Sequence, residues 1–436
     1  MKAIHKAISM IFLILGLMTL SSVGAGWSSP MVLNKIDARN LKIRLDSLGN
    51  AIAIWETFDG KDSHNVQTAR LSKGGSWTEP TTLSSYAGGV EVSASPVLAV
   101  SPAGHAVAIW QEWTGNQFIL KSSISDGGDW TFPVSISDPS QSNYWQRMEM
   151  DQFGNAIAIW KKHNVSSVIQ SAVLPFRGTW STPATLSDPK LKAIEPQIAV
   201  NYSGNAIAIW MIEGPDYLIE SSTRLTNGQW SSPLILRSGS NRAALPKIVL
   251  DSMENAAAVW IEFVGNVSPG VEINSARLPF KGVWSKPSPI TPPVDSVSID
   301  FPFILDGKGN GILLWVSSPK NSASHIQAAA YHNEGSWSKP VVISSLPKEV
   351  QDGTVALAVS PSGRAVATWH WNYEDRIHAS MLLPDGSWSP PATLPGKDSE
   401  LQDVAMDPRG YAVVCWTADG IQGKVTLYAV WTPSTE

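Results

Sequence analysis

The sequence predicts an all-β protein built from eight copies of one four-stranded unit, and two series of tryptophans carry the prediction. Sixteen of the 20 tryptophans in this 436-residue chain recur at intervals of roughly fifty residues. Repetition at such a period is typical of propellers, solenoids and arrays. The first series ends runs such as Asn-Ala-Ile-Ala-Ile-Trp and comprises Trp55, Trp110, Trp160, Trp210, Trp260, Trp315, Trp369 and Trp416. Each tryptophan of the second series is followed by Ser or Thr and, two residues after that, by proline. This series comprises Trp27, Trp77, Trp130, Trp180, Trp230, Trp284, Trp337 and Trp388.

Each repeat alternates short apolar runs with turn residues. The repeat that begins at Trp180 contains four runs rich in β-branched and aromatic residues, separated by Gly, Asn, Asp and Pro. This pattern indicates a four-stranded antiparallel meander, and no window has a sustained helical period. The proline that follows each second-series tryptophan removes a backbone donor, so that strand belongs at a sheet edge.

The strand that ends in a first-series tryptophan shows how the repeats pack. Successive strand residues face opposite sides, so Ala51, Ala53 and Trp55 share one face while Ile52 and Ile54 share the other. Both faces are apolar, which indicates a sheet covered on both sides. The branched face of one repeat can fill the alanine face of the next. The sequence therefore predicts an eight-bladed β-propeller.

The two ends of the chain account for the eighth blade. Residues 27–33 form an outer strand with no inner strands before it, and the C-terminal part offers three strands at about 401–407, 411–417 and 423–431. Pairing these ends completes the last blade, closes the ring and removes free strand edges. Trp431 follows Trp416 too soon for the repeat and is interpreted as the end of a third strand.

The N-terminus predicts export. Lys2 and Lys6 precede an apolar run over residues 7–20 and then small residues up to Ala25, which is the order of a secretory signal. We expect residues 1–25 to be cleaved and residues 26–436 to form a single propeller domain. A membrane span needs about 20 apolar residues, and this run is shorter. The expected location is secreted, periplasmic or on the cell surface.

Composition narrows the function classes. The net charge is −5 and only 16% of residues are charged, with Lys and Arg scattered, which argues against nucleic acid as a partner. The one cysteine, Cys415, lies in an apolar run and is interpreted as a buried, inert thiol. No phosphate loop, nucleophile elbow or metal-ligand spacing is present. We predict no cofactor, no metal, no catalytic set and a monomer.

The turn between the first two strands of a repeat has the pattern Asp-x-x-Gly-Asn, as in residues 46–50, 151–155 and 306–310. Glycine supplies a positive φ and the aspartate can accept the turn amides. An alternative is a calcium site, but calcium takes six to eight oxygens and each turn offers one carboxylate. Replacement of the Asp by Ser101, Asn201 or Ser360 also favours a hairpin.

Alternating strand directions divide the loops between two faces. The turns between strands one and two and between strands three and four repeat closely and define the turn face. The loops between strands two and three and the connections between blades vary in length and composition, and they define the variable face. Variable loops on a rigid frame are the usual place for binding.

Three of the four remaining tryptophans fall on the variable face. The candidate ligand-binding residues are these tryptophans and their polar or aromatic neighbours: Trp113, Tyr144, Trp145, Arg147, His370, Trp371, Tyr373 and Arg376. An exposed aromatic side chain next to polar groups can stack against a sugar ring. The alternative is that these side chains only cover the blade tops.

Carboxylates near the same face carry a second hypothesis. Five glutamates follow first-series tryptophans or lie close beyond them: Glu56, Glu112, Glu213, Glu262 and Glu374. We therefore expect them to be grouped around one mouth of the ring. Two such groups could serve as the acid and base of a glycoside hydrolase or sialidase-like enzyme. The cluster at residues 370–376 could also bind a metal, although a solvated loop is the favoured interpretation.

The repeat pattern resembles that of exported bacterial β-propeller proteins with Gly-Asn-Ala-x-Ala-x-Trp and Trp-Ser-x-Pro blades, over residues 26–436. Residues 125–130 and 384–388 are also similar to the Asp-box turns of sialidase-type propellers, and the Asp-Gly-Asn turns to NHL-type propellers. Sialidases have six blades and an arginine triad; the candidates here are Arg39, Arg147, Arg242 and Arg376. The first resemblance implies the fold, and the NHL-type one implies an interaction module.

Taken together, these features favour a secreted, non-catalytic binding module whose ligand is a glycan or a protein surface. Trp113, Trp145 and Trp371 favour a glycan, whereas the broad loops of mixed charge favour a protein. The alternative is the glycan-cleaving enzyme described above.

Overall fold

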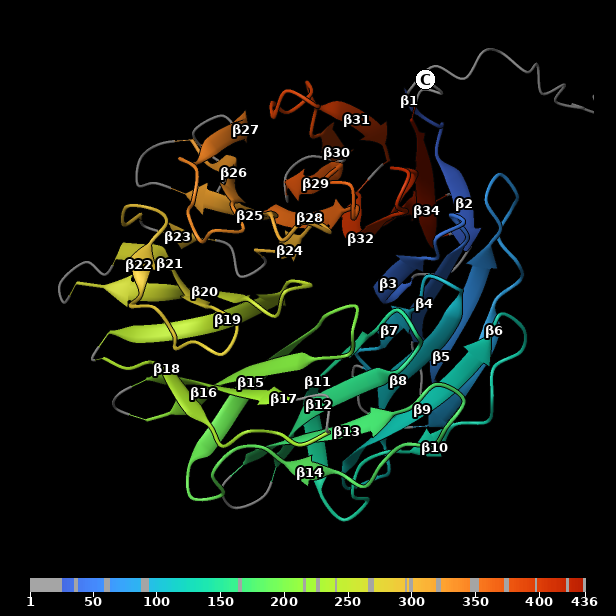
Figure 1. Cartoon of the computed structure of the whole chain (residues 1–436). Helices are drawn as coiled ribbons and strands as arrows, with labels where there is room; N and C mark the ends of the chain where they lie inside the picture. Colours follow the sequence, from blue (N-terminus) through green and yellow to red (C-terminus); the bar gives the residue numbers. More distant parts are fainter. Residues whose placement is uncertain are drawn as a thin grey trace, which may run out of the picture.

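In a computed structural model, the chain forms an eight-bladed β-propeller, as the repeats predict (Figure 1). The structure describes residues 26–34, 38–58, 63–87, 94–163, 167–214, 217–224, 228–239, 241–265, 270–294, 296–297, 301–318, 323–345, 353–371, 376–396, 398–420 and 423–433. The predicted signal segment, residues 1–25, lies outside these ranges. No helix within them is long and apolar enough to cross a membrane.

Each blade is an antiparallel sheet, and in the first seven blades the strands are ordered from the ring axis outward as they occur in the chain. Blades one to four contain β3 (Arg39–Leu45), β4 (Ala51–Phe58), β5 (Ser63–Leu71) and β6 (Thr81–Ala87); β7 (Val97–Val100), β8 (His105–Trp113), β9 (Phe118–Asp126) and β10 (Val134–Ser135); β11 (Ser142–Met150), β12 (Ala156–His163), β13 (Val168–Leu174) and β14 (Ala184–Thr185); β15 (Lys192–Val200), β16 (Ala206–Glu213), β17 (Leu218–Arg224) and β18 (Leu234–Arg237).

Blades five to seven follow the same plan, with the inner strand of blade six in two pieces. They contain β19 (Arg242–Leu250), β20 (Ala256–Val264), β21 (Gly270–Leu278) and β22 (Ser288–Pro289); β23 (Ser296–Val297), β24 (Phe303–Leu305), β25 (Gly311–Ser318), β26 (His325–Tyr331) and β27 (Val341–Ser345); β28 (Gly353–Val359), β29 (Ala365–Trp371), β30 (Arg376–Met381) and β31 (Ala392–Pro395). Inner strands of consecutive blades contact one another around the whole ring.

The eighth blade is assembled from both ends of the chain. β32 (Glu400–Met406), β33 (Ala412–Gly420) and β34 (Gly423–Thr432) pair with the N-terminal strands β1 (Gly26–Trp27) and β2 (Met31–Asn34). Trp27 pairs with Trp431 in register, and their ring centroids are 5.6 Å apart. The predicted closure and the placement of Trp431 at the end of a third strand are therefore confirmed.

The first-series tryptophans form the blade cores, since all eight are fully buried. The alternation inferred from the sequence is also confirmed. Ala51 and Ala53 pack with Val413 of the preceding blade, whereas Ile52 and Ile54 pack against alanines of the next blade. Cys415 lies in the same core, and burial raises the pKa of its thiol, as expected for an inert cysteine.

The Ser or Thr after each second-series tryptophan fixes the outer strand. Its hydroxyl accepts the backbone N–H of a third-strand residue in all eight blades, at 2.9–3.1 Å. In the last blade this residue is Ser28, which accepts from Val430. The N-terminal segment thus makes the same contact across the closure that the other blades make within one continuous repeat.

The Asp-x-x-Gly-Asn turns are structural, as the hairpin interpretation predicts. Asp151 Oδ1 accepts the N–H groups of Phe153 and Asn155 at 2.9 Å each, and Asn155 Oδ1 accepts the N–H of Phe176 in the other turn of the same blade. Asp151 also packs against Gly204 of the next blade. The turns therefore link strands within a blade and also link neighbouring blades.

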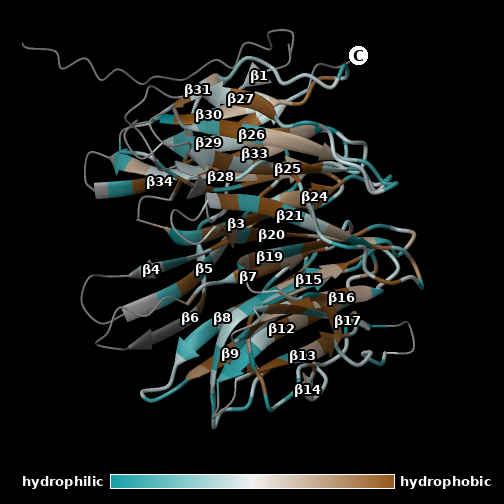
Figure 2. Ribbon diagram, turned by 90° about the vertical axis from the view of Figure 1, so that its left-hand side faces the viewer, coloured by the Kyte–Doolittle hydropathy of each residue, from teal (hydrophilic) through white to brown (hydrophobic). Residues whose placement is uncertain are grey.

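Loops project from both sides of the ring when it is turned edge-on (Figure 2). The turn face and the variable face defined from the sequence are these two sides. Each first strand ends at an Asp-x-x-Gly-Asn turn or a variant of it, and each second strand returns to the opposite side.

Candidate functional site

The inner strands enter the ring at the variable face with an unusual backbone. Five residues at the equivalent position, six before the turn Asp or its substitute, have a left-handed φ of 42–57°: Asn40, Ser95, Trp145, Glu195 and Leu245. Four of them coincide with a register shift typical of a β-bulge. Such a φ is uncommon for residues other than glycine. Five blades therefore share this backbone, and the residue type differs from blade to blade.

Trp145 is the one aromatic residue among these five. Its φ is 57°, and 42% of its surface is accessible. The Lys161 ammonium lies 4.6 Å from the centroid of its ring, a cation–π contact. Burial lowers the pKa of Lys161, and the nearby carboxylate of Glu213 opposes this shift. Trp145 therefore offers an indole surface beside a cationic group.

An aromatic row lies across blades two and three. It consists of Trp113, Phe118, Tyr144 and His163, with successive ring centroids 4.8, 5.4 and 6.1 Å apart. These residues come from β8, β9, β11 and β12, and none is fully buried. The structure thus brings the predicted residues Trp113 and Tyr144 into the same row, with Trp145 next to Tyr144 in the chain.

Polar contacts hold the connection that leads into this region. Asp138 accepts the N–H and hydroxyl of Ser140 at 2.9 and 2.7 Å, and the Lys162 ammonium at 3.1 Å. The Ser140 hydrogen bonds and the Lys162 charge lower the pKa of Asp138 to about 2. Gln117 donates to the Ser140 carbonyl at 2.7 Å. The loop next to the aromatic row is therefore anchored at neutral pH.

The predicted exposure of the blade-seven aromatics is wrong in part. Trp371 is 1% exposed and packs in the core between blades six and seven, and His370 is 7% exposed. The reason is that β29 continues for two residues beyond Trp369 between covered faces. Arg376 is exposed at the start of β30, and Tyr373 lies outside the described residues. Arg147 is exposed on β11, beside the Trp145 bulge.

The carboxylates of the enzyme hypothesis are engaged with their neighbours. The four described ones lie at or near the ends of second strands, one strand out from the axis. Glu56 is buried and accepts from Asn40 and the Ala94 N–H; Glu262 pairs with Arg237 at 2.6 Å; Glu112 accepts from Ser84 at 2.6 Å; and Glu213 pairs with Lys192 at 3.8 Å. Glu374 lies outside the described residues.

Within the described ranges no three His, Cys, Asp or Glu side chains are grouped as metal ligands. The four arginines compared with a sialidase triad belong to four different blades: Arg39 to β3, Arg147 to β11, Arg242 to β19 and Arg376 to β30.

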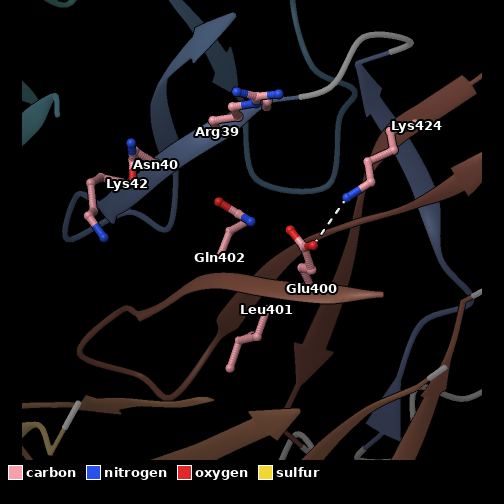
Figure 3. Close-up of a pocket in the computed structure, with 8 residues that line it drawn as sticks. Arg39, Asn40, Lys42, Glu400, Leu401, Gln402 and Lys424 are labelled. Atoms are coloured by element: carbon pink, nitrogen blue, oxygen red, sulfur yellow. Dashed lines mark hydrogen bonds and ion pairs between the residues drawn. The ribbon is translucent and has the colours of Figure 1, made fainter. Parts of the chain in front are cut away.

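A second feature of the variable face was missed by the sequence analysis. A cavity of about 490 Å³, the seam pocket, lies between the inner strands of the last and first blades (Figure 3). It is lined by Ala38, Arg39, Asn40, Lys42, Glu400, Leu401, Gln402 and Lys424. Glu400 and Lys424 form an ion pair at 3.1 Å. The only signal in the sequence was the predicted pairing of the two chain ends, which places these distant segments side by side.

Comparisons with known proteins bear on the fold. No protein-family model matches the chain, and no curated protein matches it in sequence. Among solved structures, the BP39L lectin from Burkholderia pseudomallei is similar, with 13% identity, TM-score 0.54 and coverage of 82% of this chain and 99% of the lectin.

Two polysaccharide lyases are also similar. A PL25 ulvan lyase bound to -[GlcA(1-4)Rha3S]- has 11% identity and TM-score 0.53, with coverage of 80% of this chain and 96% of the lyase. The lyase Uly1 has 10% identity and TM-score 0.50, with coverage of 92% and 90%. At such low identity these likenesses establish the propeller fold alone.

Proposed function

We propose that this protein is a glycan-binding module and that the glycan lies on the variable face against Trp145 and the aromatic row. The observation that carries the proposal is the exposed indole of Trp145 on a left-handed backbone. That conformation costs a bulky residue about 1–2 kcal/mol. Strain of this kind is concentrated at binding and active sites.

The surroundings of Trp145 suit a sugar. A saccharide can stack its apolar face on an indole while polar groups hydrogen-bond its hydroxyls. Lys161 beside the ring and Arg147 two residues further on supply donors at this place. The aromatic row continues the apolar surface across two blades, which is a length suited to more than one sugar unit.

The structural neighbours support the same ligand class. One is a lectin, and another is a polysaccharide lyase with a bound saccharide. Binding is favoured over cleavage because the four described carboxylates of the enzyme hypothesis are each held by neighbouring side chains or backbone. Export through residues 1–25 remains part of the proposal and agrees with a role in binding extracellular or periplasmic glycans.

The test is a glycan panel titrated against the protein while tryptophan fluorescence is followed. We expect at least one glycan to shift the emission, and Trp145→Ala to weaken its binding by on the order of tenfold, about 1.4 kcal/mol. The matched control is Phe153→Ala, which removes a 61% exposed aromatic from the turn face and should leave binding unchanged.

Two results would overturn the proposal. Equal losses in Trp145→Ala and Phe153→Ala would show that the variable face has no special role. Release of cleaved product from the bound glycan would show that the protein is an enzyme and not a binding module.

A further inference from the structure

The seam pocket differs in chemistry from the aromatic row. Its lining is almost entirely polar, with Ala38 and Leu401 as the apolar members, and both are buried. Its volume of about 490 Å³ lies within the range of small-molecule sites. The pocket is therefore suited to a small polar ligand.

Hydrogen-bond donors line this space. Gln402 extends from β32 between the two inner strands, whereas Leu401 points the other way (Figure 3). The Gln402 Oε1 atom accepts the Leu41 N–H at 3.4 Å, so its amide nitrogen is left to donate to a ligand. Arg39 and Lys42 flank the space from β3.

The charge of the lining is positive. Three basic residues, Arg39, Lys42 and Lys424, face one carboxylate, Glu400, which gives a net charge of +2 (three minus one). Lys424 already neutralises Glu400 at 3.1 Å. Lys42 has no hydrogen-bond or ion-pair partner among the described residues. Guanidinium and ammonium groups both bind carboxylate and sulfate oxygens.

The walls of the pocket are held in place independently of any ligand. Asn40, the bulge residue between Arg39 and Lys42, donates to the buried carboxylate of Glu56. Asp403 accepts the Ile43 N–H and the Arg44 guanidinium at 3.0 Å each. These contacts fix β3 against β32, so the cationic side chains project from a preorganised frame.

We propose that the seam pocket is an anion subsite that binds the carboxylate or sulfate ester of an acidic sugar. The anion preference follows from the pocket alone, and only its attachment to a sugar rests on the proposed function. Because the pocket joins the last blade to the first, a bound ligand bridges the ring closure. Ligand binding should therefore also raise the unfolding temperature of the protein.

The probes are D-glucuronate, D-galacturonate and galactose 6-sulfate, each compared with its neutral parent hexose by isothermal titration calorimetry. Acetate and inorganic sulfate test the free anions. We expect at least one acidic sugar to bind tenfold or more tighter than its parent and than either free anion. Its affinity should fall at higher ionic strength, because the contact is electrostatic.

The variants are Arg39→Gln with Lys42→Gln, and Lys339→Gln as control. Lys339 is an exposed lysine on the outer part of blade six, so it matches the charge removal away from the pocket. The double variant should lose the preference for the acidic sugar. Without ligand, it should unfold at the same temperature as the unmodified protein. Lys339→Gln should change neither.

Equal affinity for acidic and neutral sugars would overturn the anion subsite, as would an unchanged preference in the double variant. Free anions that bind as tightly as acidic sugars would overturn the sugar part alone. Trp145→Ala distinguishes the two proposals. It should leave monosaccharide binding at the seam pocket unchanged. If it also left glycan binding in the panel unchanged, the proposed function would fail while the anion subsite would stand.

Discussion

At the scale of single residues, Trp145 combines three properties that rarely occur together. It is a large apolar side chain, it is 42% exposed, and its φ is 57°. A left-handed backbone at this position is shared with four other blades, whose residues are Asn40, Ser95, Glu195 and Leu245. The left-handed backbone therefore recurs among the blades, whereas a tryptophan at this position occurs in blade three alone among these five.

A pair of substitutions tests whether the bulge imposes this backbone. Trp145→Gly should be more stable to urea than Trp145→Ala by about 1 kcal/mol, because only glycine adopts a positive φ without strain. Both variants lose the indole and should lose glycan binding equally. If the alanine variant is as stable as the glycine variant, the left-handed conformation is not fixed by the fold.

The off-series tryptophans show how far residue patterns reach. Subtracting the two series correctly singled out Trp113 and Trp145 as non-core residues on the variable face. It failed for Trp371, because the pattern gives no sign that β29 continues past Trp369 into a covered region. Lys161 was not predicted as a candidate site residue, because its contact with Trp145 depends on the pairing of β11 with β12.

At the scale of elements, the Asp-x-x-Gly-Asn turn is the repeated joint of the ring. Its glycine has two separate requirements, a positive φ and space for the neighbouring blade. Gly204 has a φ of 83°, and a Cβ atom there would lie 2.9 Å from Asp151 Oδ2. Gly386, in a turn between third and fourth strands, has the same φ but nothing within 4 Å of such an atom.

This matched pair separates the two requirements. Gly386→Ala should lower the free energy of unfolding by about 1 kcal/mol, which is the backbone term alone. Gly204→Ala should lower it by a further 1–3 kcal/mol or so, because overpacking displaces the Asp151 carboxylate. The measurement is urea unfolding of both variants. Equal losses would show that the contact between blades at this turn carries no stability.

The sequence predicted the turns but not the bulges. A turn is recognisable because glycine, aspartate and asparagine recur at fixed positions. The five residues with a left-handed backbone, Asn40, Ser95, Trp145, Glu195 and Leu245, share no residue type. Their common backbone depends on how consecutive inner strands meet. Glu195, for example, accepts the Leu245 N–H of the next blade at 2.9 Å.

At the scale of the whole molecule, ring closure was predictable because the number of strands at the two chain ends adds up to one blade. The seam pocket was not, because it depends on the side chains of β3 and β32, which are separated by most of the chain. The closed ring gives the protein two unlike sides. One side is a rigid set of turns, and the other carries the aromatic row and the seam pocket.

The central claim is that ligands occupy the variable face, and a crystal structure of the protein with a glycan selected from the panel tests it most directly. The account predicts electron density for a sugar ring stacked on the Trp145 indole, with further units along the row towards Trp113. Density for the glycan on the turn face, or on the outer strands of the blades, would contradict it.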